Sequence, residues 1–178
     1  RLDPRADVQV ITPMYRGEVG VDRVNRELRE KLNPAGPALG EGERLFRQGE
    51  RVLVTRNDAE RELFNGETGR VVGVNVAERS LAVDFGGRVL TFDEAKANDL
   101  VPAYAISVHR AQGSEYAAVV IPLVTQHFVM LRRTLLYTAV TRARRLCVIV
   151  GSRRALEIAV RDARRDERCS RLRERLKG

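Results

Sequence analysis

The sequence has few cysteines and no long apolar run, which excludes several classes of protein. Cys147 and Cys169 do not form a metal-binding pattern and do not suggest a disulfide framework. Cys147 lies inside an apolar run, where a cysteine is expected to be a small buried side chain. No signal peptide or membrane-spanning stretch is present, so we expect a cytoplasmic protein that does not associate with membranes.

A phosphate-binding loop is also missing from the sequence. The pattern G-x-x-x-x-G-K-[ST], whose backbone N–H groups cradle phosphates, occurs nowhere in the chain. No acidic pair follows an apolar strand in a convincing context, since Asp84 after Val83 belongs to a run of short strands. We therefore expect that this chain alone cannot hold ATP and Mg²⁺.

The charge of the chain suits a polyanionic partner. The 178 residues carry a formal net charge of +8, and the pI is about 10.3. Nearly all basic residues are arginines, with lysine only at Lys31, Lys96 and Lys177, a bias that a GC-rich genome would also produce. Hydrophobic residues make up 43% of the chain, which is enough for a core.

Hydrophobic patterns predict an α/β domain that is interrupted by an all-β segment. We expect a strand at residues 8–11 and a helix at 19–32, where Val21, Val24, Leu28 and Leu32 recur at helical spacing. Short strands follow at 51–55, 69–76, 80–85 and 88–92, with Asn65-Gly66 and Gly86-Gly87 as turn signals, which indicates a small barrel. The α/β pattern then returns, with strands at 103–107, 117–124 and 146–150, helices at 128–142 and from 155, and a charged tail at 161–178.

Two segments carry the residues that suggest chemistry. Residues 135–152 read LLYTAVTRARRLCVIVGS, a helical run that ends in arginines just before an apolar strand. Such an arginine can bind phosphate oxygens, or it can be a surface residue that favours the negative end of a helix. Residues 103–116 read AYAISVHRAQGSEY, where polar residues follow a strand, as they do at ligand sites of α/β sheets.

The order and spacing of these segments resemble a known family. The chain looks like the C-terminal part of a superfamily 1 DNA helicase of the RecD-like type, with residues 103–116 as motif V, LLYTAVTRARR as motif VI and residues 8–25 (VQVITPMYRGEVGVDRVN) as motif IV. The resemblance implies a RecA-like parallel-sheet domain without its phosphate loop, at residues 1–37 and 103–178. It implies an inserted SH3-like barrel at residues 38–102.

The resemblance also assigns roles to single residues. Arg142 is expected to be the arginine finger that reaches the γ-phosphate across a domain cleft, which would be worth about 10³ to 10⁵ in rate. Arg16 is expected to be a second phosphate-sensing arginine, with a structural role as its alternative. Residues expected to approach the nucleotide are Gly113 and Glu115, and those expected to face single-stranded DNA are Ser107, His109 and Arg110. Surface or ion-pair roles are expected for Arg144 and Arg145, and a core or capping role for His127.

The chain departs from the family pattern at several positions. Thr134 stands where many members have Asn, and Arg110-Ala111 where they have Lys-Ser, exchanges that keep polarity or charge near the expected cleft. Our hypothesis is a motor-domain fragment of an ATP-dependent 5′–3′ DNA helicase, whose N-terminal RecA-like domain holds most of the ATP and Mg²⁺. The alternative is a non-enzymatic nucleic-acid-binding module that uses the barrel.

Overall fold

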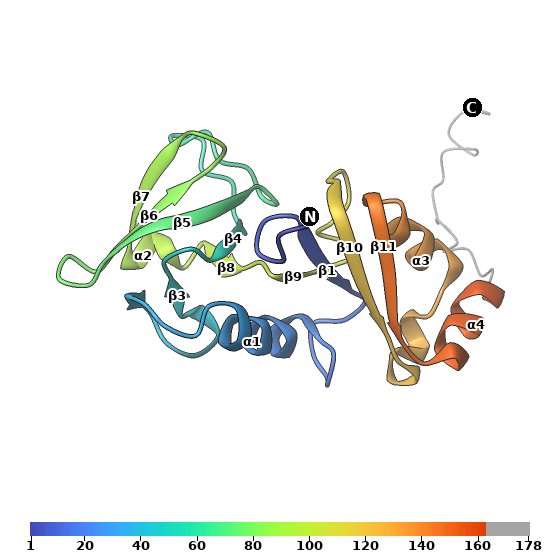
Figure 1. Cartoon of the computed structure of the whole chain (residues 1–178). Helices are drawn as coiled ribbons and strands as arrows, with labels where there is room; N and C mark the ends of the chain where they lie inside the picture. Colours follow the sequence, from blue (N-terminus) through green and yellow to red (C-terminus); the bar gives the residue numbers. More distant parts are fainter. Residues whose placement is uncertain (163–178) are drawn as a thin grey trace, which may run out of the picture.

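The computed structural model describes residues 1–162, and it is built around a parallel sheet and an antiparallel sheet (Figure 1). The parallel sheet has the strand order β11-β10-β1-β9, and all three of its pairings are parallel. Its strands are β1 (Val8–Thr12), β9 (Ala105–Ser107), β10 (Tyr116–Leu123) and β11 (Ala143–Gly151). The predicted α/β class is confirmed, with the first strand central in the sheet.

The antiparallel sheet lies between β1 and β9 in the chain and has the order β7-β6-β5-β4-β8. It comprises β4 (Arg51–Val54), β5 (Thr68–Asn75), β6 (Ser80–Asp84), β7 (Val89–Asp93) and β8 (Leu100–Pro102). Gly86 and Gly87, at φ 70° and 100°, form the turn between β6 and β7, because glycine adopts positive φ without strain. A short pair, β2 (Ala38–Leu39) and β3 (Phe46–Arg47), a 3₁₀ turn η1 (Gly42–Arg44) and helix α2 (Glu94–Ala97) complete this part.

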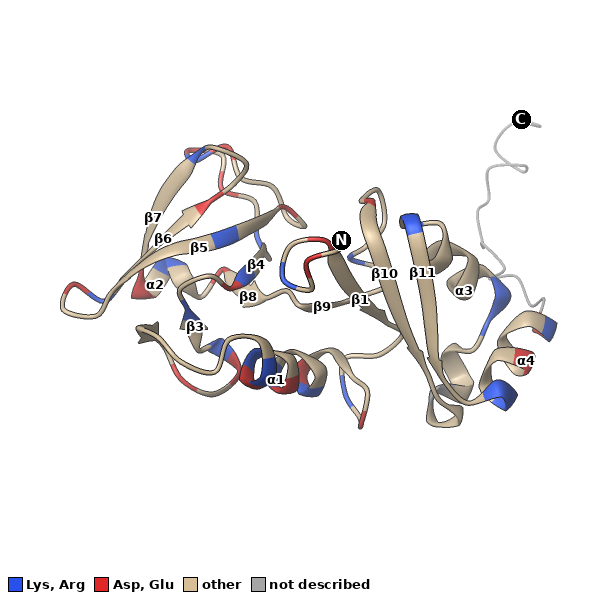
Figure 2. Cartoon of the chain, viewed as in Figure 1, with Lys and Arg blue, Asp and Glu red and all other residues tan. Residues whose placement is uncertain are grey.

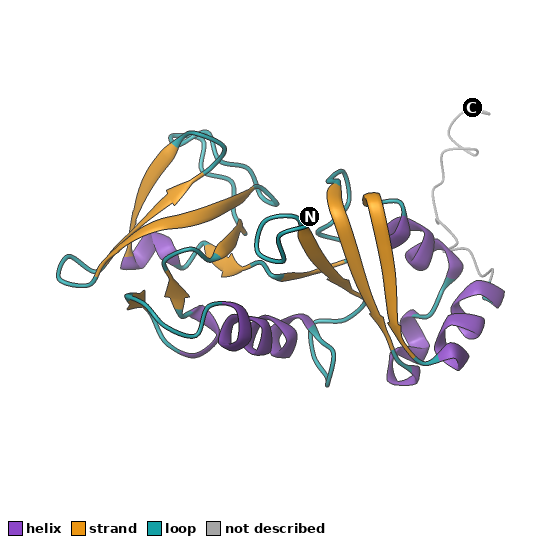
Figure 3. Cartoon of the chain, in the orientation of Figure 1, coloured by secondary structure: helices purple, strands orange, loops and turns teal. Residues whose placement is uncertain are grey.

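Helices pack against both outer strands of the parallel sheet, β9 and β11 (Figure 3). Helix α1 (Val21–Leu32) contacts the edge strand β9, whereas α3 (Arg133–Val140) contacts β10 and β11. Helix α4 (Arg153–Arg161) packs against both α3 and the 3₁₀ helix η2 (Thr125–Met130). None of the described helices has the length and apolar character to cross a membrane.

Two hydrophobic cores meet at strand β4. The first core lies on the parallel sheet and includes Ile11 and Ile121, and the second lies within the antiparallel sheet. Successive side chains of a strand point to opposite faces. Accordingly, Val52 and Val54 belong to the second core, while Leu53 between them belongs to the first. We call residues 38–102 the antiparallel unit, and residues 1–37 with 103–162 the parallel unit.

The structure corrects several sequence expectations in the C-terminal half. The helix expected at 128–142 is divided into η2 and α3, because Leu131 leaves helical geometry and buries its side chain to 1% exposure in the first core. Strand β11 begins at Ala143 and is an edge strand, so Leu146 and Val150 are 45% and 53% exposed instead of buried. Cys147 is only half-buried. The expected helical tail lies outside the described residues from 163 onward.

The buried face of α1 differs from the apolar stripe that the sequence predicted. Val21 is buried, but Val24, Leu28 and Leu32 are only partly covered. The residues that are buried instead are Asn25, Arg29 and, at the end of the helix, Asn33. Buried polar groups are costly unless they form hydrogen bonds, so this face must bind polar partners.

A buried carboxylate lies immediately before strand β4 of the antiparallel unit. Glu50 is fully buried, and its burial raises the pKa from 4.5 to about 7, against the lowering effect of Arg47 and Arg29. Glu30 is the nearby acidic group that adds to the increase. Below pH 4.5 the carboxyl group binds a proton in both the folded and the unfolded chain. Between pH 4.5 and 7 only the folded chain holds it, so rising pH lowers the free energy of unfolding.

We predict that Glu50→Gln removes this pH dependence. The neutral amide should make the chain more stable than the parent at pH 8 by about 3 kcal/mol, since one pKa unit corresponds to about 1.4 kcal/mol. Urea unfolding at several pH values between 5 and 8 measures the free energy of unfolding of both chains. Glu78→Gln, at an exposed position, is the control and should follow the parent. Parallel pH profiles for Glu50→Gln and the parent would contradict the assignment.

Candidate functional site

The residues singled out in the sequence lie at two opposite edges of the parallel sheet. Because the strands run in one direction, their amino ends share one edge and their carboxyl ends the other (Figure 1). Glu115 and Arg142 immediately precede β10 and β11 and lie at the amino edge. Arg16 follows β1 and Ser107 ends β9, so both lie at the carboxyl edge. The two arginines expected to sense phosphate therefore have separate surroundings within this chain.

Arg142 is held at the amino edge by three hydrogen bonds. Its Nε donates to the Thr138 carbonyl and its Nη1 to the Ser114 carbonyl, each at 3.1 Å. Its Nη2 donates to Thr141 Oγ1, also at 3.1 Å, and the side chain is half-buried. These acceptors are neutral oxygens, which orient the guanidinium without cancelling its charge. The end of α3 and the turn before β10 thus hold a cation in a defined position.

The turn before β10 places Gly113 and Glu115 beside this cation. Gly113 has φ +82°, and a Cβ added to it would meet no atom within 4 Å, so its backbone is open to approach. Glu115 Oε2 accepts a hydrogen bond from Arg144 Nε at 2.7 Å, and both side chains are more than half exposed. An exposed ion pair of this kind contributes little to stability, so a ligand can replace it at small cost.

At the carboxyl edge, Tyr15 connects the loops that follow β1 and β9. Ser107 Oγ donates to the Tyr15 hydroxyl at 3.2 Å, and the Arg110 guanidinium lies 5.6 Å from the centre of the Tyr15 ring. Ser107 is 1% exposed, and its Oγ also accepts the Arg110 backbone N–H at 3.3 Å. Its hydroxyl therefore shapes the turn, while His109 is exposed and Arg110 is half-buried.

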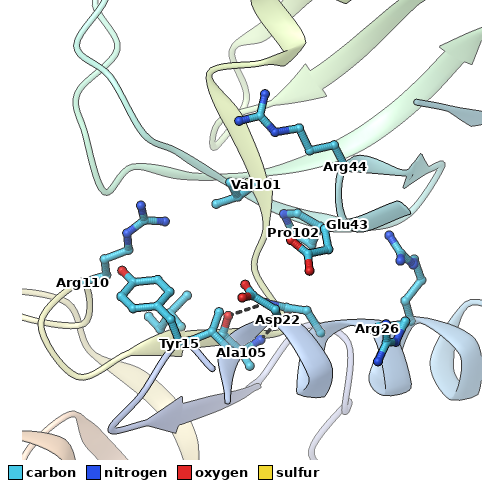
Figure 4. Close-up of a pocket in the computed structure, with 13 residues that line it drawn as sticks. Tyr15, Asp22, Arg26, Glu43, Arg44, Val101, Pro102, Ala105 and Arg110 are labelled. Carbon is cyan, nitrogen blue, oxygen red and sulfur yellow. Dashed lines mark hydrogen bonds between the residues drawn. The ribbon is translucent and has the colours of Figure 1, made fainter. Parts of the chain in front are cut away.

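A cavity of about 190 Å³ adjoins this edge, between α1, η1 and the strands β8 and β9 (Figure 4). Its charged lining consists of Asp22, Arg26, Arg29, Glu43, Arg44 and Arg110. Burial and nearby Glu43 raise the pKa of Asp22, whereas Arg16 and Arg110 lower it. Neither Tyr15 nor Asp22 was predicted from the sequence; the available signal was an aromatic residue beside Arg16 in the motif IV segment.

Two family models match separate parts of the chain. Residues 102–150 match a UvrD-like helicase C-terminal domain, and residues 24–85 match the SH3 domain of ATP-dependent RecD-like DNA helicases. The ATP-dependent RecD2 DNA helicase of Deinococcus radiodurans is 42% identical over 171 residues, which cover 93% of this chain and 23% of that protein. The RecD subunit of the RecBCD enzyme of Mycolicibacterium smegmatis is 34% identical over 165 residues, which cover 91% of this chain and 28% of that protein.

The chain belongs to the RecD-like superfamily 1 helicases. It spans about a quarter of the length of these two relatives. Within this RecD-like chain, the match to the helicase C-terminal domain contains β9, β10 and most of β11, and the match to the SH3 domain contains β2 to β6. The expected family and its two structural parts are therefore confirmed.

Solved helicase structures share the fold of this RecD-like chain. The structure of Bacteroides Pif1 helicase in complex with ADP-AlF3 and single-stranded DNA gives a TM-score of 0.61 at 18% identity, over 94% of this chain and 44% of that one. Pif1 helicase from Candida albicans gives 0.51 at 17% identity, over 83% of this chain and 48% of that one. At these identities the likeness concerns the fold alone.

The loop that carries Tyr15 and Arg16 depends on a close approach to Gly20. Helix α1 has no side-chain N-cap; instead, the Met14 and Tyr15 carbonyls accept the N–H groups of the first two helical residues. A Cβ added to Gly20 would lie 2.5 Å from the Tyr15 carbonyl oxygen and 2.6 Å from the Arg16 carbonyl carbon. The loop therefore packs on the helix only because residue 20 has no side chain.

We predict that Gly20→Ala displaces this loop and destabilises the chain by about 1–3 kcal/mol, the usual cost of overpacking. Urea unfolding measures the loss, and the NMR signals of the Tyr15 ring report the displaced loop. Gly73→Ala is the matched control, because its added Cβ would meet only the Ala82 Cβ at 3.6 Å. Equal free energies of unfolding for the two variants would contradict the prediction, because the loop would then accommodate the added methyl group without loss of stability.

Proposed function

We propose that the chain is the second RecA-like motor domain of an ATP-dependent 5′–3′ DNA helicase, at residues 1–37 and 103–178, with an SH3-like barrel inserted at 38–102. The family match supports the helicase class, and the direction of movement rests on the RecD-like resemblance. The observation that carries the proposal is the pre-oriented guanidinium of Arg142 beside the turn that holds Gly113 and Glu115.

In this proposal Arg142 is the arginine finger of a nucleotide site shared with the N-terminal RecA-like domain. Charge spreads over the phosphoryl oxygens in the transition state, and a fixed cation stabilises it without reorganising. Glu115 would accept hydrogen bonds from a ribose hydroxyl, and Gly113 would let the backbone approach the nucleotide. ATP and Mg²⁺ would be held mainly by the N-terminal domain, since the sequence contains no phosphate-binding loop.

We assign the carboxyl edge of the sheet to single-stranded DNA. His109 is exposed there for stacking or hydrogen bonding, and Arg110 offers a cation for the phosphate backbone. Ser107 would act by shaping the turn that presents them. The short segment from Ser107 to Glu115 leads from this edge to the amino edge, so it would link the strand to the nucleotide.

The alternative of a binding module based on the barrel receives less support from the side chains. Arg51 is partly buried, and Arg47, Arg61 and Arg88 donate to carbonyl or carboxylate oxygens of the chain itself. Arg56 is 79% exposed, but it lies 3.9 Å from Asp99. Few barrel arginines are therefore left to follow a phosphate backbone.

In the whole protein, Arg142→Ala should lower the turnover number of DNA-stimulated ATP hydrolysis by about 10³-fold or more, with nucleotide affinity nearly unchanged. The reason is that the finger acts on charge that develops only in the transition state. Steady-state kinetics and nucleotide titration measure the two effects. The exposed neighbour Arg145 supplies the control, and Arg145→Ala should remain near the parent rate. A nearly normal rate for Arg142→Ala would exclude the finger.

The role of Arg16 needs a separate variant because it lies at the other edge. As a phosphate sensor, Arg16→Ala should lower turnover in the same way as Arg142→Ala. If turnover is kept and affinity for single-stranded DNA falls instead, Arg16 belongs to the strand site. Fluorescence anisotropy with a labelled oligonucleotide separates these results.

The isolated 178-residue chain should not hydrolyse ATP, because the sequence contains no phosphate-binding loop. Phosphate release by the purified chain, with and without single-stranded DNA, provides the measurement. Activity that Arg142→Ala abolishes within this same chain would overturn the two-domain site.

A further inference from the structure

The two units are joined by a stripe of polar side chains on one face of α1. Asn25, Arg29 and Asn33 recur every four residues and are 7%, 3% and 7% exposed. Residues four apart lie on the same side of a helix, so a single face is involved. Charged residues occur along the whole helix (Figure 2), and the buried polar residues are these three.

The first residue of the stripe binds the parallel unit. Asn25 Nδ2 donates to the Ala105 carbonyl at 2.8 Å, and Asn25 Oδ1 accepts the Ala105 N–H at 2.8 Å. Ala105 begins β9, the edge strand of the parallel sheet, so this amide pairs with the backbone as a neighbouring strand would. Asn25 thereby fixes α1 to the strand that ends in Ser107.

The next two residues bind the antiparallel unit. Arg29 donates from Nη1 to the Leu45 carbonyl at 2.6 Å and from Nη2 to the Gly42 carbonyl at 3.1 Å. Asn33 Nδ2 donates to the Gln48 carbonyl at 3.0 Å. The segment 42–48 is itself anchored in the second core by Phe46, which is 2% exposed. One helix face thus holds both sheets.

A second attachment lies on the other side of this joint. Arg51 of β4 donates to Gln9 Oε1 at 2.7 Å and to the Val8 carbonyl at 3.2 Å, at the start of the central strand β1. Gln9 Nε2 in turn donates to the Ala103 and Tyr104 carbonyls at 3.1 and 3.0 Å, where the chain leaves the antiparallel unit. Together with Leu53 in the first core, these contacts oppose rotation between the units.

We propose that Arg29 and Asn33 are positioning residues that make the antiparallel unit a rigid extension of α1 and β9. Directional hydrogen bonds to particular carbonyls fix one orientation, which apolar packing alone would leave free to slide. Bonds from a charged donor are strong enough to shift a docked-to-undocked equilibrium about tenfold or more. This inference rests on the proposed function, and its consequence is that the antiparallel unit moves together with β9 during each ATP cycle.

The first test measures how the two units of the 178-residue chain tumble, by ¹⁵N NMR relaxation. The parent should fit a single rotational diffusion tensor. Arg29→Gln and Asn33→Ala should each raise the exchange broadening of residues 42–48 above the parent, with the chemical shifts of both cores preserved, because Arg51, Gln9 and Leu53 still attach the two units. Arg23→Ala, on the exposed side of α1, is the control and should resemble the parent. If Arg29→Gln unfolds, Asn33→Ala decides. Unchanged exchange broadening of residues 42–48 in Asn33→Ala, or two tensors for the parent, would overturn the rigid joint.

The second test uses the whole protein and compares base pairs unwound for each ATP hydrolysed. Asn33→Ala removes one neutral hydrogen bond and should lower this ratio about two- to tenfold, while DNA-stimulated ATP hydrolysis stays close to the parent rate. An unchanged ratio, or a parallel loss of both activities, would contradict the coupling role. If the parent protein neither hydrolyses ATP nor unwinds DNA, the proposed function fails, and the relaxation experiment alone decides whether the joint is rigid.

Discussion

An edge strand needs partners for its exposed backbone, and β9 obtains them from a helix. The two-way pairing between Asn25 and Ala105 satisfies one N–H and one carbonyl that a further strand would otherwise bind. Because the same helix face continues through Arg29 and Asn33, the protection of this edge also determines where the antiparallel unit is attached. The positions of β9 and of the antiparallel unit therefore both depend in part on this stripe of α1.

This constraint explains why so many polar groups are buried at the junction. Arg29 and Glu50 are almost inaccessible to solvent, and burial lowers the pKa of Arg51 as it raises that of Glu50. Taking such groups out of water is costly unless each finds partners. Arg29 finds the Leu45 and Gly42 carbonyls, whereas neither carboxylate oxygen of Glu50 has a hydrogen-bond partner in the described part of the chain. A junction of this kind has few intermediate arrangements, because its directional hydrogen bonds form in only one orientation.

The parallel sheet separates two kinds of chemistry. Its amino edge presents a held cation at Arg142 and an easily exchanged ion pair at Glu115, features that suit an anionic nucleotide. Its carboxyl edge presents Tyr15, His109 and Arg110 beside a polar cavity, features that suit the proposed binding of single-stranded DNA. Both edges are reached by the one short segment after β9, so movement at one edge has a direct covalent path to the other.

The sequence by itself determined the family, the α/β class, the inserted strands and the turn at Gly86-Gly87, because motif spacing, two-residue alternation and glycine turns are local properties. It also predicted Arg142, Gly113 and Glu115 as site residues from their order along the chain, and their roles stay predictions. Tertiary structure alone decided that Leu131 interrupts a helix, that β11 is an edge strand, and that α1 buries Asn25 and Arg29 in place of Leu28. These outcomes depend on which surfaces other parts of the chain cover. The polar face of α1 is buried because it forms hydrogen bonds with the exposed edge of β9 and with the Leu45 and Gly42 carbonyls. These partners lie outside the helix, so the pattern of residues within the helix does not predict them.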